Sequence, residues 1–377
     1  MKILKKLTVT TALLLSFYLT NAQTPQPVIN RTQANRIEGL TIFRDATADV
    51  QRLKDQGKTL LQVVCDLKNS YANSAESILK ATATVFGSTE AVIIINMKGC
   101  WTIDQIAKGL QAAYNYSNDQ LIFKLKVAGY TAQQCFDLLF RVYDLSIDQL
   151  AVNLKFAGFT ATQIILAINS SQMYALNDMG NSLKLAGFLI GEITNAFKAG
   201  LNKNGQTCAN SLLALNYTAN EIGNALKTSF TASFETVAGW LKQAGFGANS
   251  ILAMGKQVYS VSINLAYSTL KNLGYTTDRI TEALIKGMNA QVTDVVRALN
   301  SLGVGPQAII NALQKAGADG VKVGNALKTV LNKSANDVAD MMNKAGYGAS
   351  IIISALSDAF GIARNVIDGI LSALGIN

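Results

Sequence analysis

The chain has 377 residues, of which 49% are hydrophobic, 15% are charged and only three are proline. This composition argues against a disordered chain, and the scarcity of chain-breaking residues argues against an all-β fold. The sequence contains no histidine, which excludes histidine-dependent hydrolases and histidine-ligated zinc or iron sites because both need an imidazole. We therefore expect an all-helical protein that is not an enzyme, with no catalytic residues, no metal site and no cofactor.

Residues 1–22 have the features of a secretory signal peptide. Three lysines lie among the first six residues, an apolar run covers residues 7–19, and Ala22 supplies a small residue for cleavage. A membrane anchor is the alternative, but the run is shorter than the roughly 20 residues that span a bilayer. We expect cleavage after Ala22 and a secreted, periplasmic or cell-surface protein with no transmembrane segment in its mature form.

Net charge changes when this leader is removed. The sequence has 33 Lys and Arg against 24 Asp and Glu, and three of the lysines belong to the leader, so the mature charge is about +6 before the chain termini. A charge of this size is weaker than the concentrated basic patches of nucleic-acid-binding proteins. Residues 23–44 show no repeated pattern and are interpreted as a linker.

One phrase, Leu-Lys-x-Ala-Gly-aromatic-Thr-Ala-x-x-Ile, returns along the rest of the chain. Its glycine position, here called the anchor, recurs at steps of 29 residues, at Cys100, Gly129, Gly158, Gly187, Asn216, Gly245, Gly274 and Gly303. The next anchor, Gly317, comes only 14 residues later, and the 29-residue step then resumes at Gly346 and Gly375. Such a strict period is the signature of a repeat architecture.

The phrase has the punctuation of two helices joined by a short turn. Glycine and asparagine tolerate the left-handed conformation that closes a helix, so the anchor is expected to end the first helix. The second helix is expected to begin at the hydroxyl residue two positions later. These candidate N-caps are Thr102, Thr131, Thr160, Thr218 and Thr276, and four of them form capping boxes with Gln105, Gln134, Gln163 and Glu221.

Two short helices cannot bury their apolar faces alone, so the units must stack. We predict a right-handed α-solenoid of tandem two-helix, 29-residue repeats with a half-repeat phase shift near 303–317. The helix after Pro306 is expected to serve as the second helix of one unit and the first helix of the next. The predicted boundaries are 45–87 for divergent capping repeats, 88–362 for regular repeats and 363–377 for a C-terminal half-repeat helix.

The phrase Leu-x-x-x-Gly-aromatic-x-x-x-x-Ile resembles the repeats of mitochondrial transcription terminators. The resemblance covers only those residues of each unit, and it implies an α-solenoid that binds DNA. The proline that commonly follows in that family is missing here, and the leader lacks the arginine-rich character of a transit peptide. Nucleic acid is therefore not the expected partner.

A column of lysines three residues before the anchors is the first candidate binding site. Its members are Lys126, Lys155, Lys184, Lys242 and Lys271. Aligned along one edge of a stack they could bind a polyanion. The alternative is structural, because a lysine in the last turn of a helix is favoured by the helix dipole and its stem can cover apolar surface.

A column of aromatic residues directly follows the anchors. It consists of Trp101, Tyr130, Phe159, Phe188, Tyr217, Phe246, Tyr275 and Tyr347. Such a ladder could stack on sugars or bases. Aromatic residues that seal the joint between adjacent repeats would produce the same column.

The apolar C-terminal helix is a candidate surface for self-association, because no unit follows it. The residues concerned are Val366, Ile367, Ile370, Leu371 and Leu374. An uncapped solenoid end can recruit another molecule. The alternative is burial of these side chains against the preceding helix pair.

The four cysteines, Cys65, Cys100, Cys135 and Cys208, are too far apart for a structural zinc site. Helical repeats bring only near neighbours into contact, so the pairing expected in an exported protein is Cys65 with Cys100. Free buried thiols are the alternative.

These patterns favour a secreted or periplasmic interaction scaffold that binds a protein or a glycan. The alternatives are a structural, self-assembling surface or matrix protein, a polyanion-binding solenoid, and a membrane-active protein, the last suggested by a mean hydropathy of +0.22.

Overall fold

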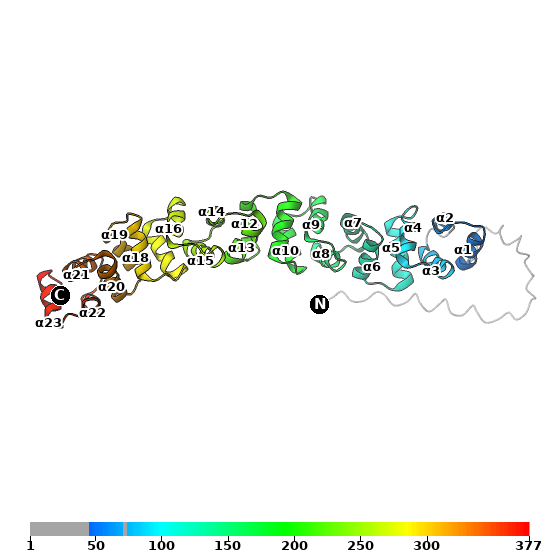
Figure 1. The fold of residues 1–377 in the computed structure, drawn as a ribbon. Helices are drawn as coiled ribbons and strands as arrows, with labels where there is room; N and C mark the ends of the chain where they lie inside the picture. Colours follow the sequence, from blue (N-terminus) through cyan, green and yellow to red (C-terminus); the bar gives the residue numbers. More distant parts are fainter. Residues whose placement is uncertain (1–44, 71–73, 377) are drawn as a thin grey trace, which may run out of the picture. The chain divides into compact units, whose positions relative to one another are not determined.

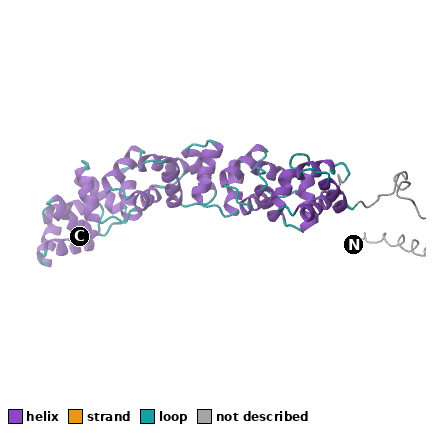
Figure 2. Ribbon diagram, turned by 45° about the vertical axis from the view of Figure 1, so that its right-hand side comes forward, coloured by secondary structure: helices purple, strands orange, loops and turns teal. Residues whose placement is uncertain are grey.

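The computed structural model describes residues 45–70 and 74–376, and the predicted signal peptide and linker lie outside them. Within these ranges every regular element is a helix, with loops between the helices and no strand, as Figure 2 shows. This confirms the all-α prediction. Among the same residues, none of the helices is both long and apolar enough to cross a membrane.

From Ala46 onward the helices follow one another in chain order along a stack (Figure 1). Each helix packs on its neighbour in the chain and on the helix two places away, which sorts the helices into an odd-numbered and an even-numbered layer. These are the contacts of a helical-repeat solenoid. Its right-handed sense and its 29-residue unit stay predictions.

The even layer contains eleven of the described helices. They are α2 (Leu60–Asp66), α4 (Glu90–Met97), α6 (Asn118–Val127), α8 (Ile147–Phe156), α10 (Leu176–Leu185), α12 (Gly205–Ala214), α14 (Phe234–Ala244), α16 (Ile263–Asn272), α18 (Val292–Ser301), α20 (Gly320–Leu331) and α22 (Ala349–Phe360).

The odd layer contains the other twelve, two of which continue into a π-helical turn. They are α1 (Ala46–Asp55), α3 (Ala75–Phe86), α5 (Ile103–Tyr114), α7 (Ala132–Tyr143), α9 (Ala161–Ser170), α11 (Ile190–Asn195) with η2 (Ala196–Gly200), α13 (Ala219–Phe230), α15 (Ala248–Tyr259), α17 (Thr277–Glu282) with η3 (Ala283–Gly287), α19 (Pro306–Lys315), α21 (Ala335–Lys344) and α23 (Arg364–Ala373).

The anchors end helices as predicted, with one exception. Every anchor from Gly129 to Gly375 has a positive φ, including Asn216 at 61°. Cys100, which occupies the equivalent place one step earlier, does not. The helix α4 ends earlier, and the amides of Cys100 and Trp101 both donate to the carbonyl of Met97, which closes the helix without a left-handed residue.

The predicted N-caps are confirmed. All four capping boxes form, at Thr102, Thr131, Thr160 and Thr218. Pro306 occupies the first turn of α19, where a missing amide hydrogen leaves no bond unmade. These local contacts explain why each second helix begins where the sequence placed it.

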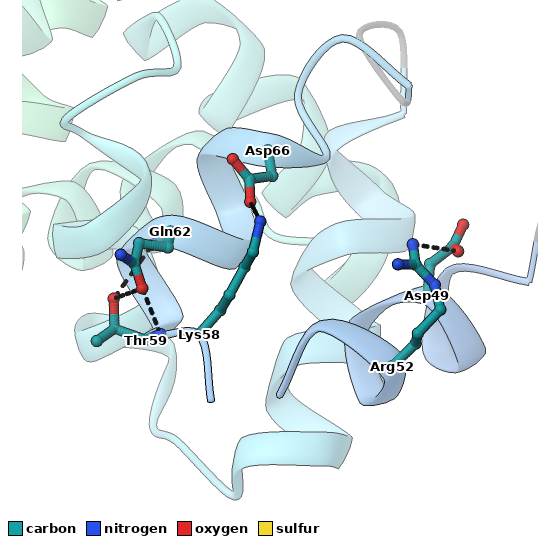
Figure 3. Close-up of polar contacts among 6 residues, drawn as sticks. All are labelled: Asp49, Arg52, Lys58, Thr59, Gln62 and Asp66. Carbon is teal, nitrogen blue, oxygen red and sulfur yellow. Dashed lines mark hydrogen bonds and ion pairs between the residues drawn. The ribbon is translucent and has the colours of Figure 1, made fainter. Parts of the chain in front are cut away.

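A further capping box lies at the start of α2 (Figure 3). The amide of Thr59 donates to Oε1 of Gln62 over 2.9 Å, and the amide of Gln62 donates back to the Thr59 hydroxyl. Beside it Lys58 forms an ion pair with Asp66 at the other end of the same short helix. Arg52 pairs with Asp49 on α1 over 3.1 Å. The divergent N-terminal region therefore has the same type of N-terminal capping box as the regular repeats.

A second set of left-handed residues, which the sequence analysis missed, ends the longer helices. Its non-glycine members include Asn115, Asp144, Asn202, Thr231, Ser260, Asn289 and Asn332. Asparagine and aspartate tolerate this conformation better than other residues with a side chain. The signal in the sequence is a polar residue 15 positions after an anchor, as at Asp144, Asn202 and Asn289.

The 14-residue slip leaves the stack continuous. The helix α19 packs on α17 before it and on α21 after it, as the dual role predicted for the helix after Pro306 requires. The slip also exchanges the layers. Anchor-bearing helices lie in the even layer up to α18 and in the odd layer from α19 onward.

The core includes the two apolar columns of the repeated phrase. The leucines four residues before the anchors 129 to 303 are completely buried, as are the isoleucines six residues after the anchors and Cys135, which takes the isoleucine's place after Gly129. Each helix contacts helices of its own layer and of the other layer. Burial of these columns therefore holds successive units together.

Two mid-helix glycines should respond oppositely to alanine. A Cβ at Gly109 of α5 would lie 2.5 Å from the Cβ of Ala75 and 2.9 Å from its carbonyl carbon, whereas at Gly369 of α23 nothing lies within 4 Å. We expect Gly109→Ala to destabilise the fold by about 1–3 kcal/mol through overpacking. Gly369→Ala should instead stabilise it by up to ~1 kcal/mol through helix propensity. Denaturant unfolding followed by circular dichroism measures both, and equal effects would contradict the close approach at Gly109.

Candidate functional site

The predicted lysine column reaches from one repeat to the next. The Nζ of Lys126 on α6 donates to the carbonyl of Gly158 over 2.5 Å and lies 5.0 Å from the centre of the Phe159 ring. Lys184 on α10 donates to the carbonyl of Leu215 over 2.6 Å and lies 4.5 Å from the Tyr217 ring. We call this arrangement a lysine latch: an ammonium bonded to a carbonyl at the end of the next unit's helix and set over the aromatic ring that follows.

The other three lysines of the column follow this pattern in part. Lys155 lies 4.5 Å from the centre of the Phe188 ring. Lys242 donates to the carbonyl of Leu273 and lies 5.1 Å from the Tyr275 ring. Lys271 differs, because it lies over Tyr267 of its own helix. A role of the five lysines in ligand binding stays a prediction.

Five of the eight rings of the aromatic column lie under a lysine ammonium, namely Tyr130, Phe159, Phe188, Tyr217 and Tyr275. Trp101, Tyr130, Phe159 and Phe188 each expose less than a tenth of their surface. A ring that is buried in the joint between repeats and covered by an ammonium offers no free face to a sugar or a base. The structural interpretation of this column is therefore the better supported one.

A second set of latches lies at lysines outside the predicted column, on α1, η2, α13 and α20. Lys54, Lys198, Lys227 and Lys328 donate to the carbonyls of Val85, Ser229, Val258 and Ala359, and they lie over Phe86, Phe230, Tyr259 and Phe360. The signal in the sequence is the spacing, because each lysine precedes its aromatic partner by 32 residues.

Removing one latch should weaken the joint between two units. Lys184→Met keeps much of the apolar stem but loses the bond to Leu215 and the contact with Tyr217. We expect a loss of about 1–2 kcal/mol, the usual range for one charged hydrogen bond with a cation–π contact. Lys322→Met, at an exposed position of α20, is the control and should change stability by less than about 0.5 kcal/mol. Equal unfolding midpoints for the two variants would show that the latch contributes nothing.

One ionised cluster departs from the repeated pattern. The hydroxyl of Tyr116 donates to Oε1 of Glu90 over 2.7 Å, and Nζ of Lys124 lies 2.7 Å from Oε2 of the same carboxylate. Although partial burial acts to raise it, the pKa of Glu90 is held below its ordinary value by these two partners. Bonding to Glu90 raises the pKa of Lys124. Both groups stay charged at neutral pH, and their ion pair joins α4 to α6.

A shallow hollow of about 440 Å³ lies between α7 and α9, lined by residues such as Tyr130, Phe159 and Leu166. Its polar groups already have partners within the protein. Gln163 caps Thr160, and Lys126 bonds to Gly158. Few groups remain to orient a small ligand. Across residues 45–70 and 74–376 no group of three or more metal-ligating side chains gathers.

The C-terminal helix α23 divides the predicted self-association residues. Ile367 and Leu371 are buried, and α23 packs against α21 and α22. Val366 is half exposed, and Ile370 and Leu374 are partly buried. Burial within the chain thus accounts for two of the five residues, which are not available to another molecule.

A different surface exposes large apolar side chains on four consecutive helices of the even layer. We call it the apolar face, and it consists of Val92 and Ile95 on α4, Phe123 and Val127 on α6, Val152 and Phe156 on α8, and Leu185 on α10. Each of these side chains exposes between 44% and 64% of its surface. Spacings of three and four residues within a helix place them on one side of it.

The apolar face ends abruptly at α12. The positions equivalent to Val152 and Phe156 are Asn210 and Ala214 on α12, Gly239 and Gln243 on α14, and Ser268 and Asn272 on α16. This surface does not show among the positions that all repeats share. The signal was present as a difference between early and late repeats at the same register.

No protein-family model matches the chain, and a comparison with curated proteins finds no significant similarity.

Proposed function

We propose that this protein is an exported, non-enzymatic interaction scaffold that binds a protein partner through the apolar face. The observation that carries the proposal is the row of seven half-exposed apolar side chains on α4, α6, α8 and α10, where later repeats carry small or polar residues. Monomeric proteins rarely expose contiguous apolar patches above a few hundred square ångströms, and larger patches mark interaction sites.

The chemistry of this face favours a protein over the other candidate ligands. Valine, isoleucine, leucine and phenylalanine side chains present no hydrogen-bonding group to a glycan. The aromatic column that suggested sugar or base stacking is largely buried, and most lysines of the polyanion hypothesis are engaged in latches. Binding energy at such a face would come from burial of apolar area, with aromatic residues such as Phe123 and Phe156 as anchors.

Position-specific photo-crosslinking tests the proposal. A photoreactive phenylalanine analogue is placed at position 156 of α8, and, as the matched control, at position 268 of α16 in cells that produce the chain. Irradiation should give covalent protein adducts from position 156 and not from position 268. The absence of any adduct from position 156, with the variant folded and exported, would overturn the proposed function.

A further inference from the structure

The apolar face has the properties of a surface that binds its own copy. Resting on the proposed function, we propose that the partner at this face is a second copy of the chain, in a closed dimer with two-fold symmetry. Three observations lead to this partner: the area of the face, its lack of charge, and the order of the charges along its two edges.

The area suits a dimer of ordinary size. Seven large side chains that each expose about half of their surface offer roughly 600 Å² of apolar area, near the upper limit for a monomer. A standard interface covers about 800 Å² per partner, with an apolar centre and a polar rim. The seven side chains alone therefore provide enough apolar area for the centre of such an interface.

The absence of charge matters because of symmetry. In a two-fold interface the same patch lies on both sides, so a charge near the axis meets its own copy and repels it. The apolar face is uncharged by definition, so the relevant charge is that of its neighbours. Lys124, which follows Phe123 on α6, is paired with Glu90 of α4 and adds no unpaired charge at this position.

The edges of the face are charged in a complementary order. The first turns of α6, α8 and α10 carry Asp119, Asp148 and Asp178, whereas Glu90 of α4 is already paired with Lys124. The other ends of these three helices carry Lys126, Lys155 and Lys184. Their latches leave the ammonium charge in place, because the carbonyls and rings that they contact have no net charge. A two-fold axis parallel to the stacking direction makes the facing helices antiparallel, so the acidic edge of each copy lies over the basic edge of the other. The other in-plane axis would place acidic edges together.

This axis fixes which residues meet across the dimer. The two-fold rotation places α8 of one copy over α8 of the other, and Val152 lies near the middle of that helix. Val152 therefore faces its own counterpart across the axis. Because the patch is used on both sides, assembly closes at two copies and does not continue into a fibre.

Analytical ultracentrifugation of the mature chain over about 0.1–100 µM, a range that brackets ordinary affinities, measures the association. We expect a reversible monomer–dimer equilibrium. Phe156→Asp replaces the most exposed side chain of the apolar face by a charge and should weaken the dimer at least ~100-fold, the effect of losing a strong interface anchor. The matched control, Ser268→Asp on α16, should associate like the wild type. Circular dichroism of both variants shows that they are folded.

Cysteine cross-linking tests the orientation. In Val152→Cys two facing thiols are oxidised by added oxidised glutathione, which accepts two electrons and two protons and yields two reduced glutathiones. The expected product is a disulfide-linked dimer from Val152→Cys and none from Ser268→Cys. The natural free thiols, Cys135 and Cys208, are buried and should not cross-link.

The outcomes separate the two proposals. A monomer at all concentrations, assembly beyond two copies, or a dimer unaffected by Phe156→Asp would overturn the self-association. Adducts at position 156 whose mass corresponds to another protein would then leave the interaction scaffold standing with a different partner. Adducts of twice the chain mass support both proposals.

Discussion

Above pH 9 the stability of this protein is expected to fall steeply. Burial raises the pKa of the Cys135 and Cys208 thiols from 9.0 to about 12. Burial likewise raises the pKa of Tyr130 and Tyr347 from 10.0 to about 12. In each case the folded state holds the neutral form, and the unfolded chain releases its proton at a lower pH.

The sign follows from linkage. A group whose pKa is raised on folding contributes its full stability below the unfolded value and loses it as the pH rises toward the folded value. For the thiols that window runs from about 9 to about 12. Each pKa unit corresponds to about 1.4 kcal/mol, so the two thiols together can remove several kcal/mol across the window.

Denaturant unfolding at pH 8, 9, 10 and 11 measures this loss. The double variant Cys135→Ala, Cys208→Ala is the control, and its stability should depend less on pH in the same range. A second readout is thiol reactivity. At neutral pH the native protein should not react with a thiol reagent, and the unfolded, unreduced chain should expose two thiols. A stability that stays constant to pH 11 would contradict the burial of these groups.

Loss of the Cys65–Cys100 disulfide should destabilise the N-terminal units. The pairing that the repeat spacing favoured is present, with the two Cα atoms 5.6 Å apart and a sequence separation of 35. Chain-entropy estimates for a loop of this size are about 4 kcal/mol, and measured values are often smaller. Because a solenoid is stabilised by nearest-neighbour contacts, the loss should stay local to α2 and α4 and should not spread evenly over the stack.

Hydrogen exchange by mass spectrometry, before and after reduction, measures where stability is lost. We expect faster exchange in α2 and α4 of the reduced protein, with little change from α12 onward. The Trp101 indole, which donates to the carbonyl of Val64 over 2.9 Å, should retain part of the protection. Cys65→Ser with Cys100→Ser should reproduce the effect of reduction. Unchanged exchange in α2 would show that packing alone holds this end.

The fold was predictable where a residue acts on its own helix. Thr102 and Gln105 form a capping box that spans four residues of one chain segment. Leu125 and Ile106 are buried, and each belongs to a column of apolar residues that recurs at the same position of successive repeats. The disulfide was predictable because repeats bring only neighbours together. In each of these cases the partner residue lies in the same unit or in the next one. The 29-residue period therefore indicates which residues come close together.

The candidate binding surface was less accessible to sequence reasoning. The sequence does not distinguish a Lys126 that projects into solvent from one that bonds to Gly158. The partner is a backbone carbonyl, which every residue has. Phe156 looks like a core residue until the stack shows which side of α8 it occupies.

The lysines of the latches bond to backbone carbonyls and not to charged side chains, which affects how freely the repeats can vary in sequence. A carbonyl is present whatever residue occupies the position, as at Gly158, Leu215 and Leu273. The joint therefore tolerates changes in the residue it contacts, provided that the lysine and the ring remain. Neighbouring repeats can diverge at their surfaces, as α8 and α12 have done, without losing the contact that aligns them.

The exchange of layers at α19 bears on how a protein of this kind could change over generations. Up to α18 the outward residues of the anchor-bearing helices line one side of the body, and from α19 onward they line the other. Duplication or deletion of a single helix would therefore turn every later surface to the opposite side while leaving each joint as well packed as before. A gene built from such units could acquire a second, oppositely directed binding side in one event, without a single substitution in the repeats themselves.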